Sequence, residues 1–441
     1  MNANVQTNDE QSQSLWRATA TPAPATVSLE GGADGDVAII GAGYTGLCCA
    51  IVMAEAGRRV VVLEAQEIGH GASGRNGGQV IPGLARDPDD IVTRFGRERG
   101  EALVRLAGGT ADRVFTLIAK YRIDCAATQC GWIQPAHSAA AAKMIVARAR
   151  QWKMRHAPVE LLSGSSLAAA LGTDAYRAGW LDRRAGALQP LSYVRGLARI
   201  ALGAGAIIYT RSAAAQILRN SGDWRVRTPR GEVRAPQVVL ATDAYSGALW
   251  PELPRNQIVV TGAQTATAPL PDAIRRAILP QGNIVSDTRR LQYYFRLDSE
   301  GRFVIGGRAS AADAVPERVY KTLRRVAIRM YPGLADVQWP YRWYGRVGIT
   351  RDGIPHLAEV APGLWAALGY CGRGVAMATT MGLVLGDMLS EGGRLSYPVA
   401  SLAPISWQAL RLPVLRAAIA YHRMRDGMAS RTLGADRGKR A

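Results

Sequence analysis

The chain has 441 residues, of which 48% are hydrophobic, and it carries a formal net charge of +19. This length exceeds what one ordinary core needs, so we expect two structural units, and the composition excludes a fibrous, disordered or membrane-spanning protein. The basic residues are scattered rather than gathered in a stripe, which favours a generally basic surface, or an anionic substrate, over nucleic-acid binding.

The five cysteines form no CxxC pair and have no histidine at a spacing typical of metal ligands. This odd number favours reduced thiols over a disulfide framework or a zinc site, so we expect no metal. The polar N-terminus shows no secretory signal, and these features together predict a cytoplasmic protein.

Residues 1–35 show no helical or strand periodicity and are predicted to form a loosely held N-terminal arm. Order begins at Asp36, where an apolar strand, a glycine turn, a helix and a second strand follow one another up to Glu64. This succession is typical of the start of a parallel βαβ unit.

The glycine turn carries the pattern GxGxxG at Gly41, Gly43 and Gly46. The first glycine permits the tight turn, the second lets the backbone approach a diphosphate, and the third lets helix and strand pack closely. The first amides of the helix then face the diphosphate, while Glu64 accepts hydrogen bonds from a ribose. Together, the strand, the glycine turn, the helix and the acid after the second strand predict dinucleotide binding and disfavour NADP. They do not separate FAD from NAD.

The segment directly after the second strand reads GASGRNGGQV and favours FAD. Its four glycines allow the backbone to lie against a flat ring, and its polar side chains offer hydrogen bonds: Ser73, Asn76 and Gln79. An NAD-binding domain would normally continue with a helix at this point.

Two patterns alternate along the rest of the chain. Helical spacing dominates 87–157, and stretches typical of an antiparallel sheet occupy 251–344, whereas strands and glycine turns in α/β order return in 158–250 and 345–395. We therefore expect an α/β fold with a discontinuous, Rossmann-like FAD-binding domain (36–86, 158–250 and 345–395). A substrate domain with a mixed or antiparallel sheet (87–157 and 251–344) is inserted, and 396–441 form a C-terminal helix and basic tail. Substrate is expected at the junction of the two domains.

These motifs resemble those of the D-amino-acid-oxidase-like FAD-dependent oxidoreductases, most closely the gamma-glutamylputrescine oxidoreductase branch. The similarity extends from about Ser14 to the C-terminal helix, and the pieces SGRNGG and GRGVA are specific within the superfamily. It implies a GR2-type FAD-binding domain and oxidation of the C–N bond of an amine or amino acid to an imine, by hydride transfer to the flavin.

The resemblance places cofactor contacts in four segments. The first holds the pyrophosphate turn, the ribose acid and the residue after it: Gly41, Ala42, Gly43, Thr45, Gly46, Glu64 and Ala65. The second is the loop beside the flavin ring: Ser73, Gly74, Arg75, Asn76, Gly77, Gly78 and Gln79. Ala241 and Thr242 match a turn near the diphosphate, and a second turn at the flavin comprises Gly372, Arg373, Gly374 and Val375.

Several positions depart from the family pattern. Asp243 and Cys371 stand where the branch often has Asn. Some relatives carry a flavin-linking His near the position of Asn76, so its absence predicts non-covalent FAD. Others have an oxygen-activating Lys over the ring where this chain aligns Val304, so O₂ and a quinone or carrier both stay open as electron acceptors.

The candidates for catalytic roles are Arg373, His70, Tyr294 and Arg296. A helix that begins at GRG would direct its N-terminus and the charge of Arg373 toward the reduced ring, unless this side chain faces solvent. Tyr294 and Arg296 alternate on a predicted strand, so they share a face that lines either a substrate pocket or the core. His70 is either a base or a cap of the adjoining loop. Trp343 and Tyr344 are further pocket candidates.

Residues 406–431 are predicted to form a basic amphipathic helix, which either packs on its own domain or lies on an anionic membrane. Two alternatives to an amine oxidoreductase of this branch stay open. One is a D-amino-acid or glycine-type dehydrogenase that passes electrons to a quinone or carrier. The other is a non-catalytic protein that binds flavin or a polyanion.

Overall fold

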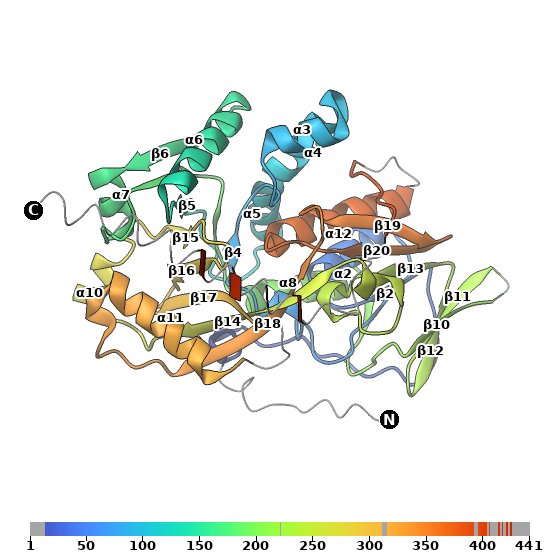
Figure 1. Ribbon diagram of the computed structural model, residues 1–441. Helices are drawn as coiled ribbons and strands as arrows, with labels where there is room; N and C mark the ends of the chain where they lie inside the picture. The colour runs from blue at the N-terminus through green and yellow to red at the C-terminus, as the bar shows by residue number, and fades with distance from the viewer. Residues whose placement is uncertain are drawn as a thin grey trace, which may run out of the picture.

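The computed structural model describes residues 14–220, 222–310, 315–391, 396–403 and 405, together with 413, 414, 417, 420, 421, 424 and 425. Two large sheets organise these residues, one of six strands and one of eight, and smaller sheets of four and two strands join them. Figure 1 shows the six-stranded sheet on the right of the view and the eight-stranded sheet extending to the left.

The six-stranded sheet is built from three stretches of the chain that lie far apart in sequence. Its order is β19 (His356–Ala361), β20 (Leu364–Leu368), β13 (Gln237–Leu240), β2 (Val37–Ile40), β3 (Val60–Leu63) and β9 (Ile207–Tyr209). Neighbouring strands run parallel except β19 and β20. The sheet is therefore the mostly parallel sheet of an α/β fold. Such a sheet is covered on both faces, as the apolar runs in its strands predict.

Alternate residues of the central strands face two different cores. In β2, Val37 and Ile39 belong to the cluster beneath the helix layer, whereas Ala38 and Ile40 belong to the opposite cluster. The helix layer contains α2 (Tyr44–Glu55), α8 (Pro190–Gly203) and α12 (Gly374–Glu391). The opposite face is covered by the four-stranded sheet β1 (Gly31–Asp34), β12 (Gly231–Ala235), β11 (Asp223–Arg227) and β10 (Gln216–Asn220).

Helices α2 and α12 approach each other closely because two glycines of α12 face α2. A Cβ at Gly382 would lie 2.3 Å from the carbonyl oxygen of Thr45, and one at Gly386 would lie 2.7 Å from Cβ of Val52. The contacts follow the same order along both helices, so α2 and α12 run in the same direction, α2 after β2 and α12 after β20.

The eight-stranded sheet is mixed and forms the second unit. Its order is β18 (Tyr341–Ile349), β14 (Ile258–Ala266), β17 (Phe303–Ser310), β16 (Tyr293–Leu297), β15 (Ile284–Ser286), β5 (Trp132–Pro135), β7 (Ala178–Asp182) and β6 (Val159–Ser163). All described pairs are antiparallel except β15 with β5. Helices α7 (Gly164–Leu171), α10 (Asp272–Ala277) and α11 (Glu317–Met330) lie along it (Figure 1).

The sheet membership changes two of the expected domain bounds and one expectation of secondary structure. β6 and β7 lie in the eight-stranded sheet, so the assignment of 158–182 to the cofactor domain is wrong. β18 continues this sheet up to Ile349, beyond the expected boundary at 345. The region 87–157, expected to be helical, also contributes β5. In each case the membership of the sheet depends on pairing with a strand from another segment of the chain, which local periodicity does not reveal.

The described part of the N-terminal region is not a loose arm. Residues Leu15–Thr19 form α1, in which Leu15 and Trp16 are buried, and Gly31–Asp34 form β1, which pairs in parallel with β12. Between them the backbone amide of Thr21 donates to Ser192 and that of Leu29 donates to Ser212. The few apolar residues of this segment therefore contribute to the core of the cofactor-binding unit.

The remaining described elements connect the two units. They are α3 (Pro88–Phe95), α4 (Arg97–Gly108), α5 (Thr110–Tyr121), α6 (Ala139–Met154), α9 (Glu252–Arg255), the two-stranded sheet β4 (Gln79–Val80) with β8 (Gly186–Ala187), and the 3-10 turns η2 (Ala72–Gly74), η3 (Asp243–Tyr245) and η4 (Pro332–Leu334). Within the described ranges, no helix is both long and apolar enough to cross a bilayer. Most of 406–431 lies outside the described residues, and so does the predicted basic helix.

Candidate functional site

The first glycine turn has the close contacts that the GxGxxG pattern predicts. Gly41 adopts φ +110°, and a Cβ there would lie 2.8 Å from the carbonyl oxygen of Ala241. A Cβ at Gly46 would lie 2.0 Å from the carbonyl oxygen of Gly41, and one at Gly43 would lie 2.8 Å from Oγ of Ser73. Only glycine fits these positions, and the turn leads directly into the N-terminus of α2.

Glu64 follows β3 and points its carboxylate back at the glycine turn. Its two oxygens accept hydrogen bonds from the backbone amides of Ala42, at 2.9 Å, and Gln66, at 3.0 Å. Burial raises the pKa of Glu64, and these amide donors oppose the rise. Each carboxylate oxygen keeps acceptor capacity beyond its amide, as a ribose contact needs. Ala65 beside it is exposed.

The loop 73–79 lies directly against the glycine turn. Oγ of Ser73 accepts from the amide of Tyr44 at 3.0 Å, and the Asn76 side chain donates to the hydroxyl of Tyr44 at 3.1 Å. The Asn76 amide oxygen accepts from the amide of Gly78, so this side chain folds the loop itself. Gln79 donates to the carbonyl of Val285 in β15, which ties the loop to the eight-stranded sheet.

The other two predicted segments join the same site. Ala241 follows β13, and its amide donates to the carbonyl of Ile40 next to Gly41. The hydroxyls of Thr242 and Ser246 lie 2.7 Å apart. Asp243 accepts from the amide of Gly369 at 2.7 Å, which joins this turn to the second glycine turn. Burial raises the pKa of Asp243 to about 6.

The second glycine turn precedes α12. Gly372 adopts φ +85°, and a Cβ there would meet no atom within 4 Å, so the turn borders open space. α12 begins at Gly374, and Val375 is buried beneath it. The guanidinium of Arg373 lies 4.7 Å from the ring centroid of Trp132 in β5, so this side chain reaches from the turn to the eight-stranded sheet.

The contacts of His70 are those of a residue that caps the adjoining loop, and not those of a catalytic base. Nε of Arg75 donates to the carbonyl of His70 at 2.6 Å, and the other end of this guanidinium lies 3.3 Å from Nε2 of His70. Since Arg has only donors, Nε2 is the acceptor. Burial and the charge of Arg75 lower the pKa of His70 to about 4, so the imidazole is neutral at neutral pH. The suggestion that His70 is a catalytic base is not supported by these contacts.

Arg296 does not line a pocket with a free guanidinium, so this expectation is corrected. Its Nε donates to the carbonyl of Gly77 at 2.9 Å, and its terminal nitrogens donate to the carbonyls of Leu188 and Leu297. The side chain is 4% exposed, and burial lowers its pKa to about 10. Tyr294 lies beside the same loop, since a Cβ at Gly77 would be 2.9 Å from its ring.

Three further side chains hold the loop, and they come from elements far away in sequence. The carbonyl of Arg75 accepts from Gln264 at 2.5 Å and from the indole of Trp343 at 3.0 Å. The carbonyl of Asn76 accepts from the indole of Trp16 at 2.8 Å. Trp343 is 2% exposed, so it supports the loop and does not line a pocket. No local sequence pattern pointed to Gln264 or Trp16 as residues that hold this loop.

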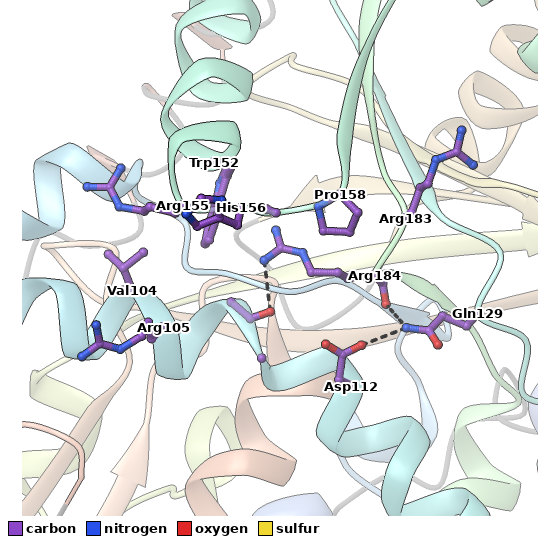
Figure 2. A pocket seen from close by; sticks show the side chains of 13 residues that line it. Val104, Arg105, Asp112, Gln129, Trp152, Arg155, His156, Pro158, Arg183 and Arg184 are labelled. Carbon is purple, nitrogen blue, oxygen red and sulfur yellow. Dashed lines mark hydrogen bonds between the residues drawn. The ribbon is translucent and has the colours of Figure 1, made fainter.

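A surface cavity of about 600 Å³ lies apart from all the predicted site residues (Figure 2). It opens between the end of α4, the α6–β6 connection and the turn after β7, and four arginines line it: Arg105, Arg155, Arg183 and Arg184. Figure 2 shows Arg184 bonded to the carbonyl of Gly108 and Gln129 bridging Asp112 to the Arg184 backbone. Arg155, Arg183 and Arg184 are paired with acids, so we place the functional site at the glycine turns instead.

The converging segments fit a dinucleotide that carries a flat ring. The first turn provides a glycine cradle at a helix N-terminus, and Glu64 provides a ribose acceptor. In the loop, the amide of Gly77 has no acceptor among the described residues. Gly372, two residues before α12 begins, borders open space. Among the described residues, no group of three or more His, Cys, Asp or Glu side chains is placed to hold a metal.

Comparisons with known proteins identify the family of this chain. The family model described as FAD dependent oxidoreductase (DAO) matches residues 36–388. Gamma-glutamylputrescine oxidoreductase of Escherichia coli is 28% identical over 95% of this chain and 99% of its own length. The probable oxidoreductase OrdL of Haemophilus influenzae is 30% identical over 82% of this chain and 84% of its own.

The fold also has solved counterparts. Glycine oxidase from Geobacillus kaustophilus superposes with a TM-score of 0.71 at 22% identity, over 85% of this chain and 99% of that one. L-proline dehydrogenase from P. horikoshii superposes with a TM-score of 0.68 at 18% identity, over 83% of this chain and 96% of that one. The expected fold class is confirmed, and the chain belongs to the DAO family of FAD-dependent oxidoreductases, with FAD as its cofactor.

Proposed function

We propose that this protein oxidises the C–N bond of an amine that carries a carboxylate, such as an amino acid or a γ-glutamyl amine, to the imine. The two glycine turns, Glu64 and the loop 73–79 would hold FAD non-covalently, and FAD would supply the acceptor for the hydride that leaves the substrate carbon. The residues of the chain bind the substrate, orient its C–H bond and exclude water from the junction of the two sheets. The observation that carries the choice of substrate is the environment of Arg373.

Arg373 is a cation without a counter-ion among the described residues. Its guanidinium stacks on Trp132 and makes no hydrogen bond or ion pair in the described part of the chain. Burial is the main reason that its pKa falls to about 10, so it stays charged at neutral pH. The nearby acids are already engaged, because Asp182 pairs with Arg184 and Asp87 pairs with Arg148.

An uncompensated guanidinium at this place favours an anionic group on the ligand. The planar fork of Arg matches a carboxylate with two parallel hydrogen bonds, and the stacked ring holds the fork in position. A plain polyamine would instead bring like charge to Arg373, which costs binding free energy. Relatives whose names state gamma-glutamylputrescine, glycine or D-amino acid as substrate act on carboxylate-bearing amines.

A substrate panel with matched variants tests the proposal. Anaerobic mixing with gamma-glutamylputrescine, glycine, D-amino acids and putrescine is followed by the loss of the visible absorbance of oxidised flavin. For the best carboxylate-bearing amine, Arg373→Ala should raise KM by about 10- to 100-fold, the range expected for one charge-assisted pair. Arg219→Ala is the control, because Arg219 is an exposed arginine stacked on Trp224 at 5.5 Å in the small sheet.

The outcomes separate two roles for Arg373. If it binds the substrate carboxylate, KM rises only for amines that have one. If it instead stabilises the reduced ring, kcat falls for every substrate, and the choice of substrate class is wrong. Retention of the oxidised absorbance with every amine would overturn amine oxidation altogether. The rate at which O₂ or a soluble quinone reoxidises the reduced protein then separates an oxidase from a dehydrogenase.

A further inference from the structure

Three consecutive carbonyls of the cofactor loop are held by side chains from outside it. Arg75 O accepts from Gln264 and Trp343, Asn76 O accepts from Trp16, and Gly77 O accepts from Arg296. Each bond lies between 2.5 and 3.0 Å. All these donors lie in the eight-stranded sheet except Trp16, which comes from α1.

The side chain and the backbone of Trp16 are both held by contacts with other segments. Its indole N–H donates to Asn76, its backbone carbonyl accepts from Gln189 at 2.9 Å, and its ring lies 5.1 Å below the guanidinium of Arg296. It meets the ring of Trp343 edge-on at 5.4 Å. The side chain is 1% exposed, so α1 closes one side of the loop.

Each of these three carbonyls belongs to a peptide whose N–H group is held in place by the same hydrogen bond. In a trans peptide the N–H points away from the C=O, so fixing one fixes the other. The amide of Asn76 donates to Ala72, and that of Gly78 donates to the Asn76 side chain. The amide of Gly77 belongs to the peptide that Trp16 holds, and it finds no acceptor among the described residues although Gly77 is half-buried.

We propose that Trp16 is a positioning residue of the cofactor site. By holding the Asn76 carbonyl, it turns the Gly77 N–H toward an acceptor atom at the edge of the flavin ring. Arg296 donates to the next carbonyl of the loop, that of Gly77, and its guanidinium packs on the Trp16 ring. The N-terminal helix thereby becomes a part of the cofactor site, and its docking and FAD retention are coupled. The inference rests on the FAD site of the proposed function, but not on the identity of the amine.

The test compares two buried tryptophans, each of which donates its indole N–H to a backbone carbonyl. Trp16→Phe keeps an aromatic ring against Arg296 but removes the donor to Asn76. The control is Trp224→Phe, because the indole of Trp224 donates to the carbonyl of Pro362 at 3.2 Å in the small sheet, away from the cofactor loop. The holoproteins are compared by the rate of FAD release, followed as flavin fluorescence, and by the visible absorption spectrum of bound FAD.

We expect FAD release from Trp16→Phe to be about 5- to 10-fold faster than from the wild type, as loss of one buried hydrogen bond implies. Its bound flavin should show a shifted visible band, because hydrogen bonds tune the electronics of the ring. Trp224→Phe should match the wild type in both readouts. Trp16→Ala, which also removes the ring contact, should release FAD faster still.

The positioning role is overturned if Trp16→Phe matches Trp224→Phe in release rate and spectrum. It is also overturned if Trp16→Phe loses stability without a change in either readout. If Trp16→Ala does not fold, the Phe variant decides. Failure of every amine to reduce the wild-type flavin would refute the proposed function, whereas the FAD release comparison would still stand.

Discussion

The hydroxyl groups of Thr45 and Tyr370 lie 2.5 Å apart and join the two glycine turns of the cofactor site. Thr45 stands in the first turn of α2, and Tyr370 precedes the second turn, 325 positions later. Both side chains are buried, at 4% and 7% exposure. Neither hydroxyl has another partner among the described residues, so each satisfies the other.

This pair predicts a strong coupling between two substitutions. Thr45→Val or Tyr370→Phe alone leaves a buried hydroxyl without a partner, so each should lower the free energy of unfolding by about 1–3 kcal/mol. The double variant removes both hydroxyls and should lose less than the sum, by roughly 1 kcal/mol. Urea unfolding of the four proteins measures the coupling, and strictly additive losses would contradict the pairing.

Asp243 predicts a pH dependence that one substitution removes. Burial raises its pKa in the folded protein to about 6, above the ordinary value of 3.8. The folded state therefore binds more protons, and this group lowers stability progressively as the pH rises from about 4 to about 6. Asp243→Asn keeps the oxygen that accepts from Gly369 and tolerates the φ of +41°, because Asn adopts left-handed conformations readily.

We expect Asp243→Asn to be more stable than the wild type at neutral pH by roughly 1–3 kcal/mol. The advantage should shrink as the pH falls from about 6 to about 4 and level off below that, where the wild-type carboxyl becomes protonated in both states. Denaturant unfolding at several pH values measures the difference. A difference that does not vary with pH would show that Asp243 is ionised in the folded protein across the range.

Two glycine-to-alanine substitutions should have opposite effects. Gly46→Ala would place its Cβ 2.0 Å from a backbone carbonyl oxygen, so helix and strand must separate, which costs about 1–3 kcal/mol and weakens FAD binding. Gly203→Ala, at the end of α8, meets no atom within 4 Å and should stabilise by about 0.5–1 kcal/mol. Thermal unfolding and the FAD content of the purified proteins measure both, and equal behaviour of the two variants would contradict the packing argument.

Local patterns in the sequence predict the first half of the candidate cofactor site, and the structure brings the segments that carry them together. The strand from Val37, the turn at Gly41–Gly46 and Glu64 are contiguous, and each carries its own signal: an apolar run, a glycine spacing, an acid at a strand end. The loop 73–79 was predicted on the same basis. Such features depend on backbone conformation over a few residues, which the chain encodes locally.

The roles of individual polar side chains required the tertiary structure. Arg296 and Tyr294 share a predicted strand, but the structure shows that Arg296 donates to the backbone carbonyls of Gly77, in the loop, and Leu188, outside it. His70 likewise bonds to Arg75. Periodicity assigns a side chain to a face, and the partner across that face belongs to another segment.

FAD binding could be predicted from local motifs, because each glycine turn expected at the cofactor lies within a few residues. What holds these turns in place became visible with the folded chain. Trp16 reaches Asn76 across 60 positions, and Trp343 reaches Arg75 across 268. The short strand β7 joins its sheet by pairing with β5, which belongs to another segment of the chain, and β6 joins it through β7. Hydrogen bonds and packing act over a few ångströms in space, so contacts of this kind leave no mark in the local sequence.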